Sequence, residues 1–381
     1  MSHEQRSDDQ QAARQLTRRE FLATSAGVAG AAALGMVAGG CAGKEAAGPV
    51  KSPMRTLGRT GLTVTAFSLG GIGANAAVLK AGLDKGVNFI HCAPGYGTLP
   101  QVAEAIAGRR DKVFLGLKYE RAGFSDLKYI DRSLQALKVD AVDILFFPLI
   151  RPDDARDRKH LEFFEQVKKR RQARFIGITA HANVPATMQA AVEAGFWDVL
   201  MPSYSPEARA REALRPVLDQ AEKNNLGVVA MKTMTGVRPG EVNHLRTILK
   251  EVLADSSVTT LVKGMLTFEL FEALWGALGM KATPAESAAL QRHLAALGGQ
   301  ACLVCGNCPT CPRGVAVFDV VRAYDYYYTQ GGCAEFARTV YAELPASARG
   351  GACDGCGECN AHCPYGVDIA RRVQAAETML A

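Results

Sequence analysis

The residues with the most distinctive chemistry are eight of the 11 cysteines, which form two short runs near the C-terminus. The runs read CLVCGNCPTCP and CDGCGECNAHCP. The second run has the spacing C-x2-C-x2-C-x3-C-P, which is typical of a four-iron cluster site, and the first differs by one residue before its last cysteine. Small residues between the thiolates let backbone N–H groups approach the sulfides. We therefore predict two [4Fe–4S] clusters, bound by Cys302, Cys305, Cys308, Cys311, Cys353, Cys356, Cys359 and Cys363.

The pairing of these cysteines follows from two-cluster ferredoxins, in which the fourth cysteine of each motif binds the other cluster. Zinc and disulfides are the alternatives. Zinc sites prefer two separated CxxC pairs, and CxxC spacing makes poor local bridges, although an oxidising compartment favours disulfides. Cys333 lies outside both motifs and is treated as a spare. We expect one cluster on Cys302, Cys305, Cys308 and Cys363, and the other on Cys353, Cys356, Cys359 and Cys311.

The preceding part of the chain alternates short apolar runs with amphipathic stretches. Continuous apolar runs are typical of buried parallel strands, and crossover helices fill the gaps between them. Eight such units in about 230 residues predict a (β/α)8 barrel. An open doubly wound sheet is the alternative, but SLGGIGANAA only approximates its GxGxxG loop. The runs are TVTAFSLGG, VNFIHCA, KVFLGLKY, VDILFFP, RFIGITA, WDVLMPSY, GVVAMKTM and TTLVKGM.

This pattern divides the chain into three parts. Residues 1–50 are a signal and linker, residues 51–296 the α/β barrel, and residues 297–381 a small α-helical, ferredoxin-like iron–sulfur domain. Catalytic groups of such a barrel lie at the C-terminal ends of its strands. The residues predicted to meet at that mouth are His91, Cys92, Tyr96, Lys118, Pro148, Thr179, His181 and Tyr204.

Several segments from about Met54 to Met280, in the right order, resemble the aldo/keto reductase family; they are RTLGRTGLTVTAFSLGG, GVNFIHCAPGYG, KVFLGLK, VDILFFP, RFIGITAHA and GVVAMKTMTG. The resemblance implies a barrel that binds a nicotinamide cofactor and reduces carbonyls with an Asp, a Tyr, a Lys and a His. A subset of the family carries a ferredoxin tail, so the resemblance extends to nearly the whole mature chain.

Only half of that catalytic set matches this sequence. Tyr96 stands at the tyrosine position and Lys118 at the lysine position, so Tyr96 is the expected acid and Lys118 the group that favours its phenolate. His91 replaces the Asp and is the third candidate, although a satisfied histidine at the barrel mouth is an equal alternative. Pro148 replaces the family's His, which removes a hydrogen-bond donor for the carbonyl.

The resemblance also implies residues that hold NAD(P)H, and a chain that binds no dinucleotide is the alternative. Thr179 and Ala180 replace the Ser-Asn pair that holds the carboxamide, and Leu270 stands near the basic residue expected for a 2′-phosphate. Nothing in that helix therefore favours NADP over NAD. The candidate cofactor residues are Thr179, Tyr204, Gly264 and Met265.

The N-terminal segment resembles a twin-arginine export signal, because Arg18-Arg19 precede Phe-Leu and a mild apolar run. The run is rich in Ala and Gly, which bury little apolar area, so it would insert poorly as a membrane span. We predict export by the twin-arginine machinery to the periplasm or the extracytoplasmic face of the membrane; a disordered tail is the alternative. Membrane association is expected only if Cys41 is lipidated rather than a plain spacer.

Two functions follow from these observations. The first is an exported iron–sulfur oxidoreductase that acts on a small carbonyl or alcohol, with electrons from the clusters, from NAD(P)H, or from a redox partner protein or quinone. The second is an electron-transfer or partner-binding protein on a catalytically degraded barrel. The net charge of +6 includes several arginines of the N-terminal segment, so it gives no argument for a nucleic-acid partner.

Overall fold

A computed structural model describes residues 50–119, 125–149, 151–329 and 334–381. Arg18, Arg19, Cys41 and Cys333 lie outside these ranges, so export, lipidation and the spare cysteine stay predictions. In the described residues no helix is both long enough and apolar enough to cross a membrane.

The predicted barrel is confirmed. Eight parallel strands close on one another in the order β10-β3-β4-β5-β6-β7-β8-β9. Each of the eight apolar runs corresponds to one barrel strand, and the first run also includes β2 (Thr63–Thr65), which lies outside the barrel. The strands are β3 (Phe67–Gly70), β4 (Phe89–Cys92), β5 (Phe114–Lys118), β6 (Val142–Leu149), β7 (Ala173–Ala180), β8 (Val199–Pro202), β9 (Gly227–Ala230) and β10 (Thr260–Gly264).

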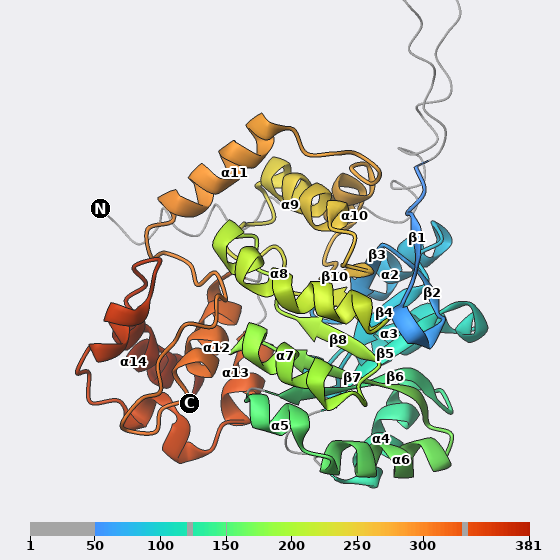
Figure 1. Ribbon diagram of the computed structural model, residues 1–381, viewed down its shortest axis with the longest axis horizontal. Coiled ribbons are helices and arrows are strands. Elements are labelled where there is room, and N and C mark those ends of the chain that lie inside the picture. Colours follow the sequence, from blue (N-terminus) through green and yellow to red (C-terminus); the bar gives the residue numbers. More distant parts are fainter. Residues whose placement is uncertain (1–49, 120–124, 150, 330–333) are drawn as a thin grey trace, which may run out of the picture.

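Helices surround the barrel and bury the outward faces of the strands (Figure 1). Local sequence sets where several of them begin. Asp126, for example, accepts a hydrogen bond from the Lys128 amide at the start of α4, as an N-cap does. The helices are α2 (Ala76–Asp84), α3 (Leu99–Ile106), α4 (Leu127–Leu137), α5 (Pro152–Arg156), α6 (Lys159–Lys169), α7 (Val184–Ala194), α8 (Ala208–Lys223), α9 (Val242–Ala254) and α10 (Phe268–Trp275).

The interior of the barrel is packed with large apolar side chains. Phe146 of β6 lies in this core, and Gly177 of β7 makes room for it, because a Cβ at Gly177 would lie 2.5 Å from the Phe146 ring. An antiparallel hairpin, β1 (Met54–Thr56) and β2 (Thr63–Thr65), adds Leu57 and Val64 to the same core. The barrel is therefore a filled core, and ligand space is left at its mouth.

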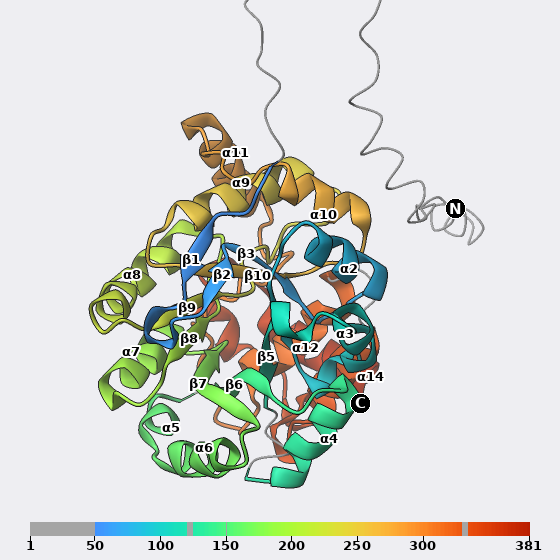
Figure 2. The same cartoon turned by 90° about the vertical axis from the view of Figure 1, so that its right-hand side faces the viewer.

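The C-terminal residues form a helical segment with an apolar core of its own. In Figure 2 the hairpin faces the viewer, and α12 and α14 lie behind the barrel, so the segment covers the end opposite the hairpin. Ser205, which follows β8, donates a hydrogen bond of 2.9 Å to the Leu303 carbonyl and ties the segment to the barrel. Its helices are α12 (Val317–Thr329), α13 (Ala334–Ala342) and α14 (Ile369–Leu380), and α11 (Pro284–Ala296) precedes it.

Candidate functional site

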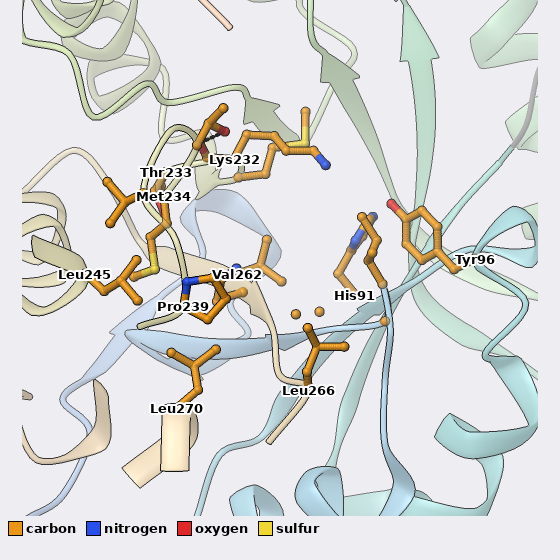
Figure 3. A pocket seen from close by; sticks show the side chains of 18 of the residues that line it. His91, Tyr96, Lys232, Thr233, Met234, Pro239, Leu245, Val262, Leu266 and Leu270 are labelled. Atoms are coloured by element: carbon orange, nitrogen blue, oxygen red, sulfur yellow. Dashed lines mark hydrogen bonds between the residues drawn. The ribbon is translucent and has the colours of Figure 1, made fainter. Parts of the chain in front are cut away.

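A cavity opens among the strand ends at the barrel mouth, and we name it the mouth cavity (Figure 3). Its wall is mostly apolar, and a few polar side chains from the strand ends project into it. The residues that line it include His91, Tyr96, Lys232, Thr233, Gly264 and the apolar Met201, Met231, Val262, Leu266 and Leu270. An apolar wall with a few polar groups is typical of a site for a small organic ligand.

Two polar atoms of this wall lack a partner. His91 Nε2 and Thr233 Oγ1 are buried and have no hydrogen-bond partner among the described residues. Buried polar atoms in folded proteins are nearly always hydrogen-bonded. Both atoms therefore mark places where a polar atom of a ligand would be bound.

His91 is a neutral histidine at this site. Burial, with a smaller contribution from the positive charges of Lys118 and Lys232, lowers its pKa to about 3. The residue that replaces the family's acid therefore does not repel Lys118. A neutral imidazole offers one N–H and one lone pair, so it can orient a bound oxygen. It cannot balance the lysine charge as a carboxylate would.

Tyr96 and Lys118 do come together. Tyr96 ends η4 (Pro94–Tyr96), which follows β4, and the Lys118 ammonium lies 4.9 Å from the centre of its ring. His91 and Tyr96 are also in contact, with ring centroids 6.1 Å apart. The sequence thus predicted a cluster of three side chains that the structure brings to one mouth. Cys92 is different: it is fully buried, and burial raises the pKa of its thiol to about 12, so its role is packing.

The sequence reasoning missed a second group at the mouth, formed by Lys232, Tyr326 and Arg322. Lys232 follows β9 and lines the mouth cavity, and its ammonium lies 4.0 Å from the centre of the Tyr326 ring of α12. Arg322 of the same helix donates a hydrogen bond of 3.3 Å to the Tyr326 hydroxyl. A lysine at the end of an apolar strand had singled out Lys118, and the same signal in GVVAMKTM would have found Lys232.

The four candidate cofactor residues fall in different places. Gly264 lines the mouth cavity, whereas Thr179 lines a neighbouring cavity with Lys118 and Arg322. Met265 is fully buried in the core between barrel and helices. The hydroxyl of Tyr204 donates a 2.7 Å hydrogen bond to Asp255, which also binds Arg215. Tyr204 does not line the mouth cavity in the described structure, and its hydroxyl is held by Asp255 instead.

The eight motif cysteines line two separate cavities. The first, which we name cavity A, is lined by Cys302, Cys305, Cys308 and Cys363; the second, cavity B, is lined by Cys311, Cys353, Cys356 and Cys359. Each cavity thus takes three cysteines of one motif and the fourth of the other. Cavity A is next to the barrel, since a Cβ at Gly306 would lie 3.2 Å from the Asn183 amide.

In the described residues the sulfurs of cavities A and B form neither a disulfide nor a site for a single metal ion. All eight are free thiols, and no three His, Cys, Asp or Glu side chains of the described residues converge to hold a single metal ion. Sulfurs spread around a cavity suit a cube in which each thiolate binds a different iron. The amides of Val304 and Val367 donate hydrogen bonds of 3.4 and 3.3 Å to Cys302 and Cys363 sulfur.

The sequence profile of the aldo/keto reductase family matches residues 74–275. The chain belongs to this family. The match runs from just before α2 to the end of α10, so it includes the mouth residues of all strands except β3 and leaves the cysteine segment outside. An aldo/keto reductase fold implies an oxidoreductase that binds a small-molecule substrate at the barrel mouth.

Solved structures agree on the fold of this family. Aldo-keto reductase AKR11C1 from Bacillus halodurans, in its holo form, is 18% identical with a TM-score of 0.51, over 64% of this chain and 95% of that chain. PA4992 from Pseudomonas aeruginosa, described as an aldo-keto reductase, is 19% identical with a TM-score of 0.50, over 60% of this chain and 96% of that one. None of the curated proteins is similar enough to match.

Proposed function

We propose that this aldo/keto reductase is an iron–sulfur oxidoreductase that converts a small carbonyl or alcohol at the mouth cavity. The observation that carries the proposal is the crossed grouping of the eight cysteines around cavities A and B. A chance arrangement of spare cysteines would have no reason to exchange the fourth member of each motif. Bound there, two [4Fe–4S] clusters would supply and accept electrons one at a time.

The mouth residues divide the remaining work. Tyr96 is the group that gives a proton to the substrate oxygen, and Lys118, over its ring, favours the phenolate that is left. His91 stays neutral and offers Nε2 to the substrate or to the cofactor. The apolar wall excludes water and holds the carbon skeleton. These roles require only that the ligand enter the mouth cavity.

NAD(P)H is the second source of electrons in this proposal. The mouth cavity continues along β10 to the start of α10, where Leu270 lines it and a helix N-terminus would attract a phosphate. Leu270 gives no charge for a 2′-phosphate, so we expect NADH and NADPH to bind alike if either binds. A redox partner protein or quinone would serve the clusters instead.

Cysteine variants test the proposal most directly. Cys308→Ser removes one cysteine that would bind the cluster in cavity A, and Cys359→Ser removes one that would bind the cluster in cavity B. Cys333→Ser is the matched control. We expect each of the first two to lose about half of the iron and one of two electron-resonance signals after anaerobic reduction, with the control unchanged. Loss of both clusters from either variant, or no iron in any protein, would refute the assignment of two separate clusters to cavities A and B.

One observation favours the alternative, an electron-transfer or partner-binding protein on a degraded barrel. Phe336 of α13 packs its edge on the Tyr96 ring, with centroids 5.1 Å apart, and so covers part of the residue expected to act on the substrate. Turnover decides between the two functions. If Tyr96→Phe leaves every measured rate of carbonyl reduction unchanged, Tyr96 is not the acid and the alternative is preferred.

We further propose that the protein is exported by the twin-arginine machinery in folded form. Support comes only from the sequence of residues 1–49. Replacing Arg18 and Arg19 together by Lys should keep the protein in the cytoplasm, and fractionation of cells with antibody detection measures this. A Cys41→Ser variant that still sediments with membranes would exclude lipidation as the anchor.

A further inference from the structure

Lys232 has a backbone conformation that calls for an explanation. Its φ is +58°, in the left-handed region that residues with a Cβ rarely adopt. The residue lies two positions after the end of β9 and lines the mouth cavity. Figure 3 shows its side chain extending toward His91 and Tyr96. Such strain persists where the surrounding structure imposes it and is concentrated at functional sites.

Tyr326 and its neighbours hold the Lys232 side chain from the other side. The ammonium is 4.0 Å from the centre of the Tyr326 ring, and that ring packs on Phe336 with centroids 4.9 Å apart. Phe336 also packs on Tyr96. Arg322 donates to the Tyr326 hydroxyl and is itself paired with Asp319 at 2.8 Å. The C-terminal segment thereby joins two tyrosine–lysine pairs, Tyr96 with Lys118 and Tyr326 with Lys232.

Burial and the neighbouring charges together lower the pKa values of both Lys232 and Tyr326. Burial lowers the pKa of Lys232, Tyr326 opposes the change, and Arg322 and Lys118 add to it. Burial alone would raise the pKa of Tyr326, but Lys232 and Arg322 lower it to about 8. The ionisable groups that face the pair are Lys118 and His91 from the barrel and Arg322 and Asp319 from α12.

Resting on the proposed function, we propose that Lys232 is a further catalytic residue and that Tyr326 is its positioning residue. The Lys232 ammonium binds the substrate oxygen and stabilises the negative charge that develops on it. This is the donor role that Pro148 cannot fill. Tyr96 still gives the proton to that oxygen. The carbonyl carbon would receive a hydride if NAD(P)H is the reductant, or two electrons and a proton from water if the clusters are. The substrate class is therefore a small carbonyl whose oxygen reaches Tyr96 and Lys232 together, and the barrel needs its C-terminal segment to hold that arrangement.

Steady-state kinetics on the iron-loaded protein test the catalytic role, with 4-nitrobenzaldehyde as the probe and NADPH or reduced methyl viologen as electron source. We expect Lys232→Met to lower kcat about 10²-fold with little change in KM, since removal of one oxyanion donor typically has that effect. Lys232→Arg should restore part of the rate. Lys281→Met, at an exposed position that does not line the mouth cavity, is the matched control.

A second measurement tests the positioning role without turnover. Ultraviolet difference titration at the phenolate band should show a tyrosine that ionises near pH 8. The signal should be absent in Tyr326→Phe, move to higher pH in Lys232→Met, and persist in Tyr327→Phe. In the wild type, kcat should fall as pH rises through this range, because the Tyr326 phenolate offsets the positive charge of Lys232. In Tyr326→Phe, this decrease of kcat with pH should be absent.

The outcomes separate this inference from the proposed function. If the wild type reduces the probe and Lys232→Met is as fast, Lys232 is not catalytic and only the inference fails. If the wild type reduces nothing with either electron source, the proposed function fails and the catalytic role of Lys232 with it. If the titration signal survives in Tyr326→Phe, or Lys232→Met leaves it in place, the pairing itself is wrong.

Discussion

The ring of Phe336 rests with its edge on the ring of Tyr96, with centroids 5.1 Å apart and planes at 81°. One residue belongs to the segment that carries the cysteines and the other to the barrel mouth. The contact therefore joins the two parts of the chain at the residue with the strongest claim to acid catalysis. Tyr96 also lines the mouth cavity, so Phe336 covers one part of Tyr96 while another part faces the space where a ligand would bind.

Shortening Phe336 tests this contact. Phe336→Ala removes a buried ring that packs on Tyr96 and Tyr326, so we expect the free energy of unfolding to fall by about 3 kcal/mol. Phe336→Leu, which keeps most of the volume, should lose less than half of that. Urea denaturation measures both. Equal stability of all three proteins would show that the segment does not depend on this contact.

The buried, neutral His91 gives the stability a pH dependence. Its folded pKa of about 3 is below the ordinary value, so the unfolded chain binds a proton that the folded chain refuses. The contribution of neutral His91 to the free energy of unfolding should therefore be fully present above about pH 6.5. It should fall by about 1.4 kcal/mol for each pH unit below that, down to the folded pKa. Urea midpoints between pH 7 and pH 5 should fall less steeply in His91→Gln. An identical slope would mean that His91 is charged or exposed in the folded protein.

Gly177 is required by the ring of Phe146 inside the barrel. A Cβ there would lie 2.5 Å from two ring atoms, whereas a Cβ at the exposed Gly240 meets nothing within 4 Å. Gly177→Ala should destabilise the protein by about 1–3 kcal/mol, as overpacking does, and Gly240→Ala should change stability by less than about 0.5 kcal/mol. Thermal unfolding followed by circular dichroism compares the two. Similar melting temperatures would contradict the packing described for the barrel.

Tyr204 was a candidate cofactor residue in the sequence, and the structure gives it a different setting. Its hydroxyl donates to the buried Asp255, which also pairs with the exposed Arg215. Tyr204→Phe should lower the free energy of unfolding by about 1–2 kcal/mol, because a buried carboxylate loses a donor. Binding of NADH or NADPH, measured by fluorescence titration, should stay as it is in the wild type. If Tyr204→Phe reduced the affinity for either nucleotide tenfold or more, Tyr204 would be part of the nucleotide-binding site.

The sequence predicted what depends on local pattern and missed what depends on packing between distant segments. Continuous apolar runs located all eight strands, because a barrel strand is buried along its whole length. The mouth trio of His91, Tyr96 and Lys118 followed from strand ends alone. The Lys232–Tyr326 contact could not be found that way, since it joins β9 to a helix almost a hundred residues later. The hydrogen bond between Tyr204 and Asp255 could not be found from local pattern either, since the two residues are 51 positions apart in the chain.

Iron and acid-labile sulfide in the wild-type protein, purified without oxygen and with the clusters loaded, test the central proposal most directly. We expect about eight iron and eight sulfide per chain, with electron-resonance signals of two interacting [4Fe–4S] clusters after reduction. A colourless protein with no iron, or one that holds zinc at the same cysteines, would contradict it.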